Sequence, residues 1–175
     1  MCYGDDCDRL ISDERLFQGV SAMYKQILLP VDLAQEASWE KALPTALKMT
    51  LENEGRLHVI TVVPDPIPMY SPYLAPMPAD WSTEHLIAQA EEKLTSFVEE
   101  HVPEDISVTG AVVQGSIGSG IVDYIEENGI DLTVMASHNP EFKDYFIGPN
   151  AAHVVRHAAC SIFVVRSADE DGHSE

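Results

Sequence analysis

One segment near the end of the chain, residues 131–166, constrains the fold more than any other. Leu132–Ala136 and Ser161–Val165 are short apolar runs typical of buried strands, and residues from about Asn150 to Ala159 follow a helical pattern. Two apolar strands joined by a helix predict a parallel β-α-β unit. A polar loop, Ser137–Asp144, leaves the first strand at its carboxyl end, where open parallel sheets bind ligands beside a reversal of strand order.

The rest of the chain alternates strands and helices in the same way. Further strands are expected at Gln26–Val31, Leu57–Val63 and Ile106–Gln114, and further helices at Ser38–Asn53, from Ser82 or Thr83 to about His101, and at Gly120–Asn128. Pro44 means that the first helix either starts late or kinks, since proline has no N–H to donate. The alternation predicts an α/β fold with a doubly wound, five-stranded parallel sheet and helices on both faces. The residues alone leave the strand order open.

Residues 115–120 form a glycine-rich stretch that resembles a dinucleotide-binding turn only superficially. Their spacing is G-x-x-G-x-G rather than G-x-G-x-x-G, and they follow the third predicted strand instead of opening the first β-α-β unit. We therefore expect an ordinary loop here. A second long loop, Pro64–Asp80, is rich in proline and aromatic residues, and it is either a lid over a site or a surface loop docking its own aromatic side chains.

The composition excludes several classes of protein. The formal net charge of −19, without a compensating basic patch, disfavours binding to nucleic acid or to anionic membranes. No apolar run approaches the roughly 18 residues that span a bilayer, so cytoplasmic residence without membrane insertion is expected. Residues 1–22 are expected to be a disordered acidic leader or a start-site artefact, residues 23–166 the folded domain, and residues 167–175 an acidic disordered tail.

Neither the cysteines nor the histidines form a recognisable metal signature. Cys2, Cys7 and Cys160 do not make a disulfide framework, and Cys160 is expected to be a small packed residue. His153 and His157 are spaced i, i+4, which metals can use, but no third ligand is evident nearby. We therefore expect ordinary surface or interface histidines and no metal site.

Four sequence blocks together resemble the universal stress protein family, closest to the branch typified by universal stress protein F. They are KQILLPVD near the start, MASH across the end of the fourth strand, GPNAAHVVRHA at the last helix, and CSIFVVR at the last strand. The resemblance covers residues 24–166. It implies a Rossmann-like sheet of the adenine-nucleotide alpha-hydrolase type in the order 3-2-1-4-5. It also implies homodimers paired through Ser161–Val165, and ATP or AMP as ligand, with Mg²⁺ possible alongside ATP.

The resemblance also nominates the lining of a nucleotide site. Asp32 can accept hydrogen bonds from a ribose hydroxyl or an adenine amino group, unless it merely caps the segment that follows. The phosphate motif departs from the family pattern, because Ala136 and Asn139 replace glycines and Pro149 replaces a serine, threonine or asparagine. AMP is therefore easier to house than ATP. The nominated residues are Pro30, Val31, Asp32, Val62, Met135, Ala136, Ser137, His138, Asn139, Gly148, Pro149 and Asn150.

The function expected from these observations is that of a cytoplasmic, dimeric adenine-nucleotide binder with a regulatory or protective role in stress, acting on an unknown protein partner. A nucleotide-free dimeric interaction module of the same fold is the alternative. A slow ATPase or a self-modifying nucleotidyl or phosphotransferase is less favoured, because only Asp32 and His138 offer acid–base chemistry and no nucleophile stands beside them.

Overall fold

A computed structural model describes residues 23–64, 82–136 and 148–166 of the chain, and the predicted leader and tail lie outside these ranges. The strands are β1 (Gln26–Pro30), β2 (Arg56–Val63), β3 (Val108–Gln114), β4 (Leu132–Ala136) and β5 (Ser161–Val165). They form one five-stranded sheet in the order β3-β2-β1-β4-β5, and every neighbouring pair is parallel. The predicted strand order is confirmed.

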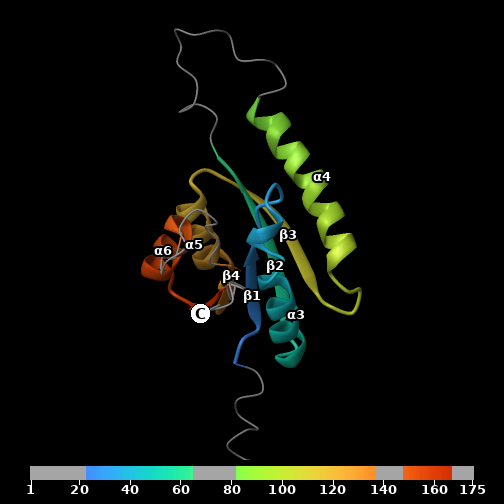
Figure 1. The fold of residues 1–175 in the computed structure, drawn as a ribbon, viewed down its shortest axis with the longest axis vertical. Helices are drawn as coiled ribbons and strands as arrows, with labels where there is room; N and C mark the ends of the chain where they lie inside the picture. The colour runs from blue at the N-terminus through green and yellow to red at the C-terminus, as the bar shows by residue number, and fades with distance from the viewer. Residues whose placement is uncertain (1–22, 65–81, 137–147, 167–175) are drawn as a thin grey trace, which may run out of the picture.

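Helices cover both faces of this sheet. The helical elements are η1 (Glu36–Ser38), α3 (Ala42–Glu52), α4 (Thr83–His101), α5 (Ile117–Asn128) and α6 (Pro149–His157). Helices α3 and α4 lie on one face and α5 and α6 on the other (Figure 1). Among the described residues, no helix is both long and apolar enough to cross a membrane.

The side chains of β1 point alternately to the two faces of the sheet, and the hydrophobic core accordingly has two layers. Ile27 and Leu29 are fully buried in the layer that α3 and α4 cover, whereas Leu28 is fully buried in the layer beneath α5 and α6. Successive strand residues point to opposite faces, so one continuous apolar strand feeds both layers. This double burial explains why β1 reads as an unbroken apolar run.

The local signals in the sequence set most helix boundaries. α3 begins at Ala42, so Pro44 falls in its first turn, and the late start replaces a kink. Ser82 caps α4 by accepting a hydrogen bond from the His85 N–H at 3.3 Å. Gly129 ends α5 in the left-handed conformation, with φ of 61°.

The prediction of an ordinary loop was wrong for residues 117–119, which belong to a helix. α5 starts at Ile117, three residues before the predicted start, and both Gly118 and Gly120 are buried within it. A Cβ at Gly118 would lie 2.9 Å from His153 Cδ2, and one at Gly120 would lie 3.0 Å from Val113 Cγ1. These glycines allow close packing of α5 on α6 and on β3, a role that the spacing of glycines cannot reveal.

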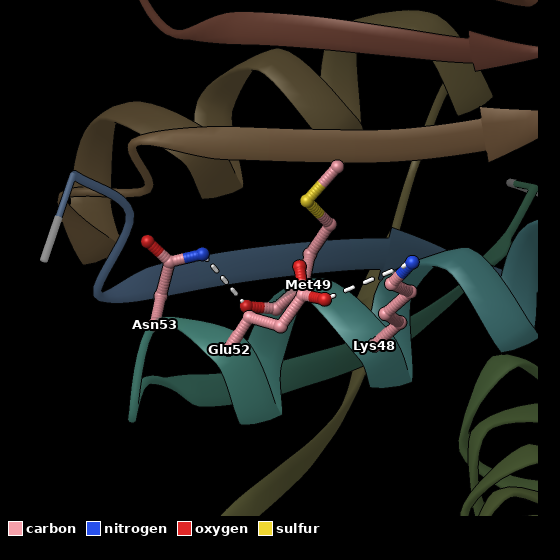
Figure 2. A network of polar contacts seen from close by, with 4 residues as sticks. All are labelled: Lys48, Met49, Glu52 and Asn53. Atoms are coloured by element: carbon pink, nitrogen blue, oxygen red, sulfur yellow. Dashed lines mark hydrogen bonds and ion pairs between the residues drawn. The ribbon is translucent and has the colours of Figure 1, made fainter. Parts of the chain in front are cut away.

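The carboxyl end of α3 is tied to the start of β1. The Asn53 side chain donates to the Met49 carbonyl at 2.9 Å (Figure 2), and its Oδ1 accepts from the Tyr24 N–H at 3.3 Å. Lys25 Nζ donates to the Asn53 carbonyl at 2.7 Å. The Met49 carbonyl also accepts from the Asn53 N–H at 3.2 Å, so the bond from Lys25 is the one that satisfies a carbonyl beyond the helix end.

The amino ends of β1 and β4 are joined by one carboxylate. The Asp131 side chain accepts from the Lys25 N–H at 2.9 Å and from the Gln26 N–H at 3.2 Å. The Asp131 N–H in turn donates to the Gln26 carbonyl at 3.0 Å. This clamp aligns the two strands, so that their carboxyl ends emerge together.

A buried polar group lies inside the α5 layer. His58 Nε2 lies 2.8 Å from Gln26 Oε1, to which it can donate, and Nδ1 lies 3.0 Å from the Tyr124 hydroxyl, from which it accepts when the ring is neutral. Burial, and secondarily the charge of Arg56, lowers the pKa of His58. The neutral ring is therefore the form that fits this position.

Cys160 is a half-buried packed residue, as predicted. Its Sγ lies 3.3 Å from the Thr133 hydroxyl, and it packs against the layer beneath α5 and α6. Burial raises the pKa of its thiol, which disfavours the reactive thiolate.

Candidate functional site

A cavity of about 390 Å³ opens at the carboxyl ends of the central strands. It lies between the ends of β1, β2 and β4 and the starts of α5 and α6. The chain leaves β1 toward β2 on one side and β4 lies on the other, so this is the point where the strand order reverses. Ligands of open α/β sheets bind at this position.

The structure brings together most of the residues that the sequence nominated for a site. The cavity is lined by Pro30, Val31, Asp32, Val62, Met135, Ala136, Gly148, Pro149 and Asn150. Ser137, His138 and Asn139 lie outside the described residues. The contact of any of these residues with a ligand stays a prediction.

Several lining residues were missed from the sequence. They are Gln35, Ser38, Ile60, Thr61, Pro64, Ile117, Ile121 and Ala151. Ile117 was missed because α5 was predicted to begin at Gly120, whereas its first turn reaches the cavity. Ser38 reaches it through a short 3-10 turn, η1, where a longer helix was expected. Thr61 and Ala151 are neighbours in sequence of nominated residues, and adjacency could have indicated them.

Asp32 both organises its own loop and offers an acceptor to the cavity. Its Oδ1 accepts from the Ala34 N–H at 2.9 Å, so the capping interpretation of this residue is correct for one oxygen. Its other oxygen makes no hydrogen bond or ion pair with any described residue. The side chain is exposed at the cavity and can still accept from a ligand hydroxyl or amino group.

The opposite wall of the cavity is the first turn of α6. Gly148 is the N-cap and Pro149 occupies the first turn, where its missing N–H costs no helical hydrogen bond. The first intrahelical bond in this turn runs from the Ala152 N–H to the Gly148 carbonyl at 2.9 Å. The N–H groups of Asn150 and Ala151 precede it and remain available, at the positive end of the helix dipole.

The described lining carries one charge and little chemistry. Asp32 is its only ionisable residue, and the described lining holds no lysine, arginine, histidine or cysteine. Within the described lining, the groups that would attract an anion are the amino termini of α5 and α6, whose first turns both reach the cavity.

A comparison with protein families shows to which family the chain belongs. Residues 23–166 match the model of the universal stress protein family. The chain belongs to the universal stress protein family. Universal stress protein G of Shigella flexneri is 31% identical over 144 residues, which cover 82% of this chain and 100% of that protein. The family prediction is confirmed. The finer assignment to the F branch differs from this finding, because the 31% identical relative is a universal stress protein G.

Solved structures show the same fold at low sequence identity. A universal stress protein from Archaeoglobus fulgidus in complex with dAMP superposes with a TM-score of 0.57 and 18% identity, covering 81% of this chain and 98% of that one. A universal stress protein family protein from Arabidopsis thaliana with AMP bound gives a TM-score of 0.55 and 14% identity, covering 86% and 97%.

Proposed function

We propose that this universal stress protein binds an adenine nucleotide in the cavity between β1, β4 and α6. The observation that carries the proposal is the position of the cavity at the switch point, with a free carboxylate oxygen on one side and a helix amino terminus on the other. Its volume of about 390 Å³ lies within the range of roughly 300–1,000 Å³ found for small-molecule pockets. The relatives solved with AMP and dAMP support this class of ligand.

The proposed pose places each part of the nucleotide against matching chemistry. Val31 and Val62 line the apolar part of the cavity and flank the adenine ring. Asp32 accepts a hydrogen bond from a ribose hydroxyl through its free oxygen. The phosphate lies at the first turn of α6, where the N–H groups of Asn150 and Ala151 donate to it.

We further infer that the site prefers a monophosphate. Each added phosphate brings negative charge into a cavity whose described lining contains one carboxylate and no cationic side chain. Pro149 also removes an N–H from the helix start that a longer phosphate chain would use. ATP with Mg²⁺ is the second candidate ligand, because the metal would neutralise part of its charge.

The biological unit is proposed to be a homodimer paired through β5. This strand forms one edge of the sheet in the described residues, and Phe163 on it is 43% exposed. An apolar edge strand is a pairing liability that a second copy would remove. Light scattering after size exclusion should give a dimer, and Phe163→Lys should give a monomer. Val155→Lys, at an equally exposed apolar position on α6, should leave the dimer intact.

The proposed cellular role is regulatory or protective, in the cytoplasm, through a protein partner that responds to the nucleotide-bound state. A nucleotide-free dimeric module is the alternative, and Ala136 and Pro149 favour it because they remove space and a donor from the phosphate side. A slow ATPase or self-modifying transferase is the least supported, since no described lining residue supplies a base beside a nucleophile.

Isothermal titration calorimetry with AMP, ADP and ATP tests the binding proposal. The wild type should bind AMP most tightly, and Asp32→Ala should weaken binding by about tenfold, as expected for a hydrogen bond to a charged group. Glu36→Ala, a neighbouring exposed carboxylate outside the lining, should bind as the wild type does. A wild type that ignores all three nucleotides would favour the nucleotide-free module.

A further inference from the structure

Against the expectation from the sequence alone, we propose that His153 and His157 form a binding site for a divalent transition metal, with Zn²⁺ as the simplest example. Both residues lie on α6, four residues apart, and their side chains therefore project from the same face of the helix. Neither histidine lines the nucleotide cavity. The proposed metal site does not depend on the proposed nucleotide binding, and the two proposals can be tested separately.

The two imidazole rings are already at the spacing that a shared metal ion requires. Their centroids lie 4.5 Å apart, and their planes are inclined by 40°. Zn–N bonds of about 2.1 Å put each ring centre roughly 3.2 Å from the metal, so an N–Zn–N angle of about 90–110° separates the centres by about 4.5–5.2 Å. The observed separation falls at the lower end of this range, and binding would use side-chain rotation to turn one nitrogen of each ring toward the ion.

Packing against α5 restricts one of the two ligands. His153 is half-buried, and its side chain rests on Gly118, where a Cβ would lie 2.9 Å from His153 Cδ2. The absent side chain at position 118 is what gives the imidazole its place. His157 is exposed in the last turn of α6, where it can complete the pair from the solvent side. A restricted first ligand lowers the entropy cost of binding.

The electrostatic setting favours a cation on balance. The carboxyl end of α6 carries the negative end of the helix dipole, and the chain as a whole has a formal net charge of −19. Arg156 lies between the two histidines in sequence and opposes binding, but its side chain is exposed and screened by solvent.

The coordination would be open. The described residues contain no cluster of three or more potential ligands, so water would fill the remaining positions around the metal. Imidazole ligands suit Zn²⁺, Cu²⁺ and Ni²⁺, whereas Mg²⁺ and Ca²⁺ prefer oxygen. We therefore expect selectivity for the first group. A bound ion would also link two successive turns of α6, the helix whose first turn lines the cavity.

The test is a titration of the full chain with ZnCl₂, followed by calorimetry and by long-range ¹H–¹⁵N spectra of the histidine side chains. The spectra report which imidazole nitrogens lose their protons or shift. We expect the His153 and His157 signals to move together. In His157→Gln, the affinity of this site for Zn²⁺ should fall at least about tenfold. Removing a residue that only hydrogen-bonds to a metal ligand already causes a loss of this size, and His157 is proposed to be a ligand itself. MgCl₂ should move neither signal.

His85→Gln is the matched control, because His85 is an exposed histidine on α4, whose ring contacts Gln89 one turn away. It should bind Zn²⁺ as the wild type does. Circular dichroism of His157→Gln should show an unchanged fold, since this side chain is exposed. The proposal is overturned if millimolar Zn²⁺ moves neither imidazole, or if His157→Gln retains the wild-type affinity at this site.

Discussion

The Ser38 hydroxyl accepts a hydrogen bond from the Asp32 N–H at 2.9 Å and donates one to the Asp32 carbonyl at 3.1 Å. The same carbonyl also accepts from the Gln35 N–H at 3.0 Å. Both main-chain polar groups of Asp32 are therefore committed to its own loop. The free carboxylate oxygen is the part of the residue left for a ligand, and Ser38 fixes where it lies.

Ser38→Ala should weaken AMP binding because it removes the two hydrogen bonds that hold the Asp32 main chain in place. This effect comes in addition to the loss of any contact between Ser38 and the ligand. Each neutral hydrogen bond contributes about 0.5–1.5 kcal/mol, so we expect the Kd to rise by about three- to tenfold. Ser38→Thr keeps the hydroxyl and should retain most of the affinity. Calorimetry of both variants checks this, and equal affinities in Ser38→Ala and the wild type would contradict a positioning role.

Asp131→Ala should destabilise the whole domain. Its carboxylate accepts from two backbone N–H groups at the start of β1, and hydrogen bonds to charged groups contribute about 1.5–3 kcal/mol each. Because the clamp is half-buried and close to solvent, we expect a total loss of about 2 kcal/mol in the free energy of unfolding. Urea denaturation measures it. Asp123→Ala removes the same charge from the exposed face of α5 and should cost little.

Gly118→Ala tests whether helix propensity or packing against His153 has the larger effect on stability at this position. Alanine is favoured over glycine in a helix interior by about 1 kcal/mol, which is an upper bound for Gly118 in the first turn of α5. The added Cβ, however, would meet three atoms of His153 at 2.9–3.1 Å, and the His153 Cβ among them cannot rotate away. We expect the clash to win, with a net loss of about 1 kcal/mol or more. Ser119→Ala, exposed on the same helix, should be neutral or stabilising, and a stabilised Gly118→Ala would refute the packing role.

The buried His58 should make stability depend on pH below neutrality. Its pKa is lowered in the folded chain from an unfolded value of 6.5, so between the two values the unfolded chain binds more protons. Stability is therefore complete above pH 6.5 and is lost as the pH falls toward the folded pKa. Urea denaturation between pH 7.5 and pH 5 should show a steeper decline for the wild type than for His58→Gln. Parallel pH profiles would rule out His58 as the source.

Much of the architecture could be predicted because its signals are local. The apolar runs at Leu132–Ala136 and Ser161–Val165 match β4 and β5 residue for residue. Pro44 indicated a late helix start through its missing N–H, and Ser82 marked a helix start through its side-chain oxygen. The strand order followed from the family resemblance, since nothing in the residues themselves says which strand lies beside β1.

The features that sequence reasoning missed depend on contacts between distant segments. Gly118 is required by His153, which is 35 positions away, so its role could not be seen in the spacing of neighbouring glycines. Ser38 enters the site because its hydroxyl bonds to Asp32 across a short turn, whereas Ser38 was predicted as the first residue of a longer helix. Asp131 reads as a surface acid, and only the parallel pairing of β1 with β4 gives its carboxylate two N–H partners.

The most direct test of the nucleotide site is mass spectrometry of the small molecules released when purified, never-dialysed protein is denatured. We predict an adenine nucleotide, chiefly AMP, at a near-stoichiometric ratio to the chain, and its loss from Asp32→Ala purified in parallel. Protein that releases no nucleotide and takes up none when AMP, ADP or ATP is added would contradict the account and leave the dimer as the functional unit.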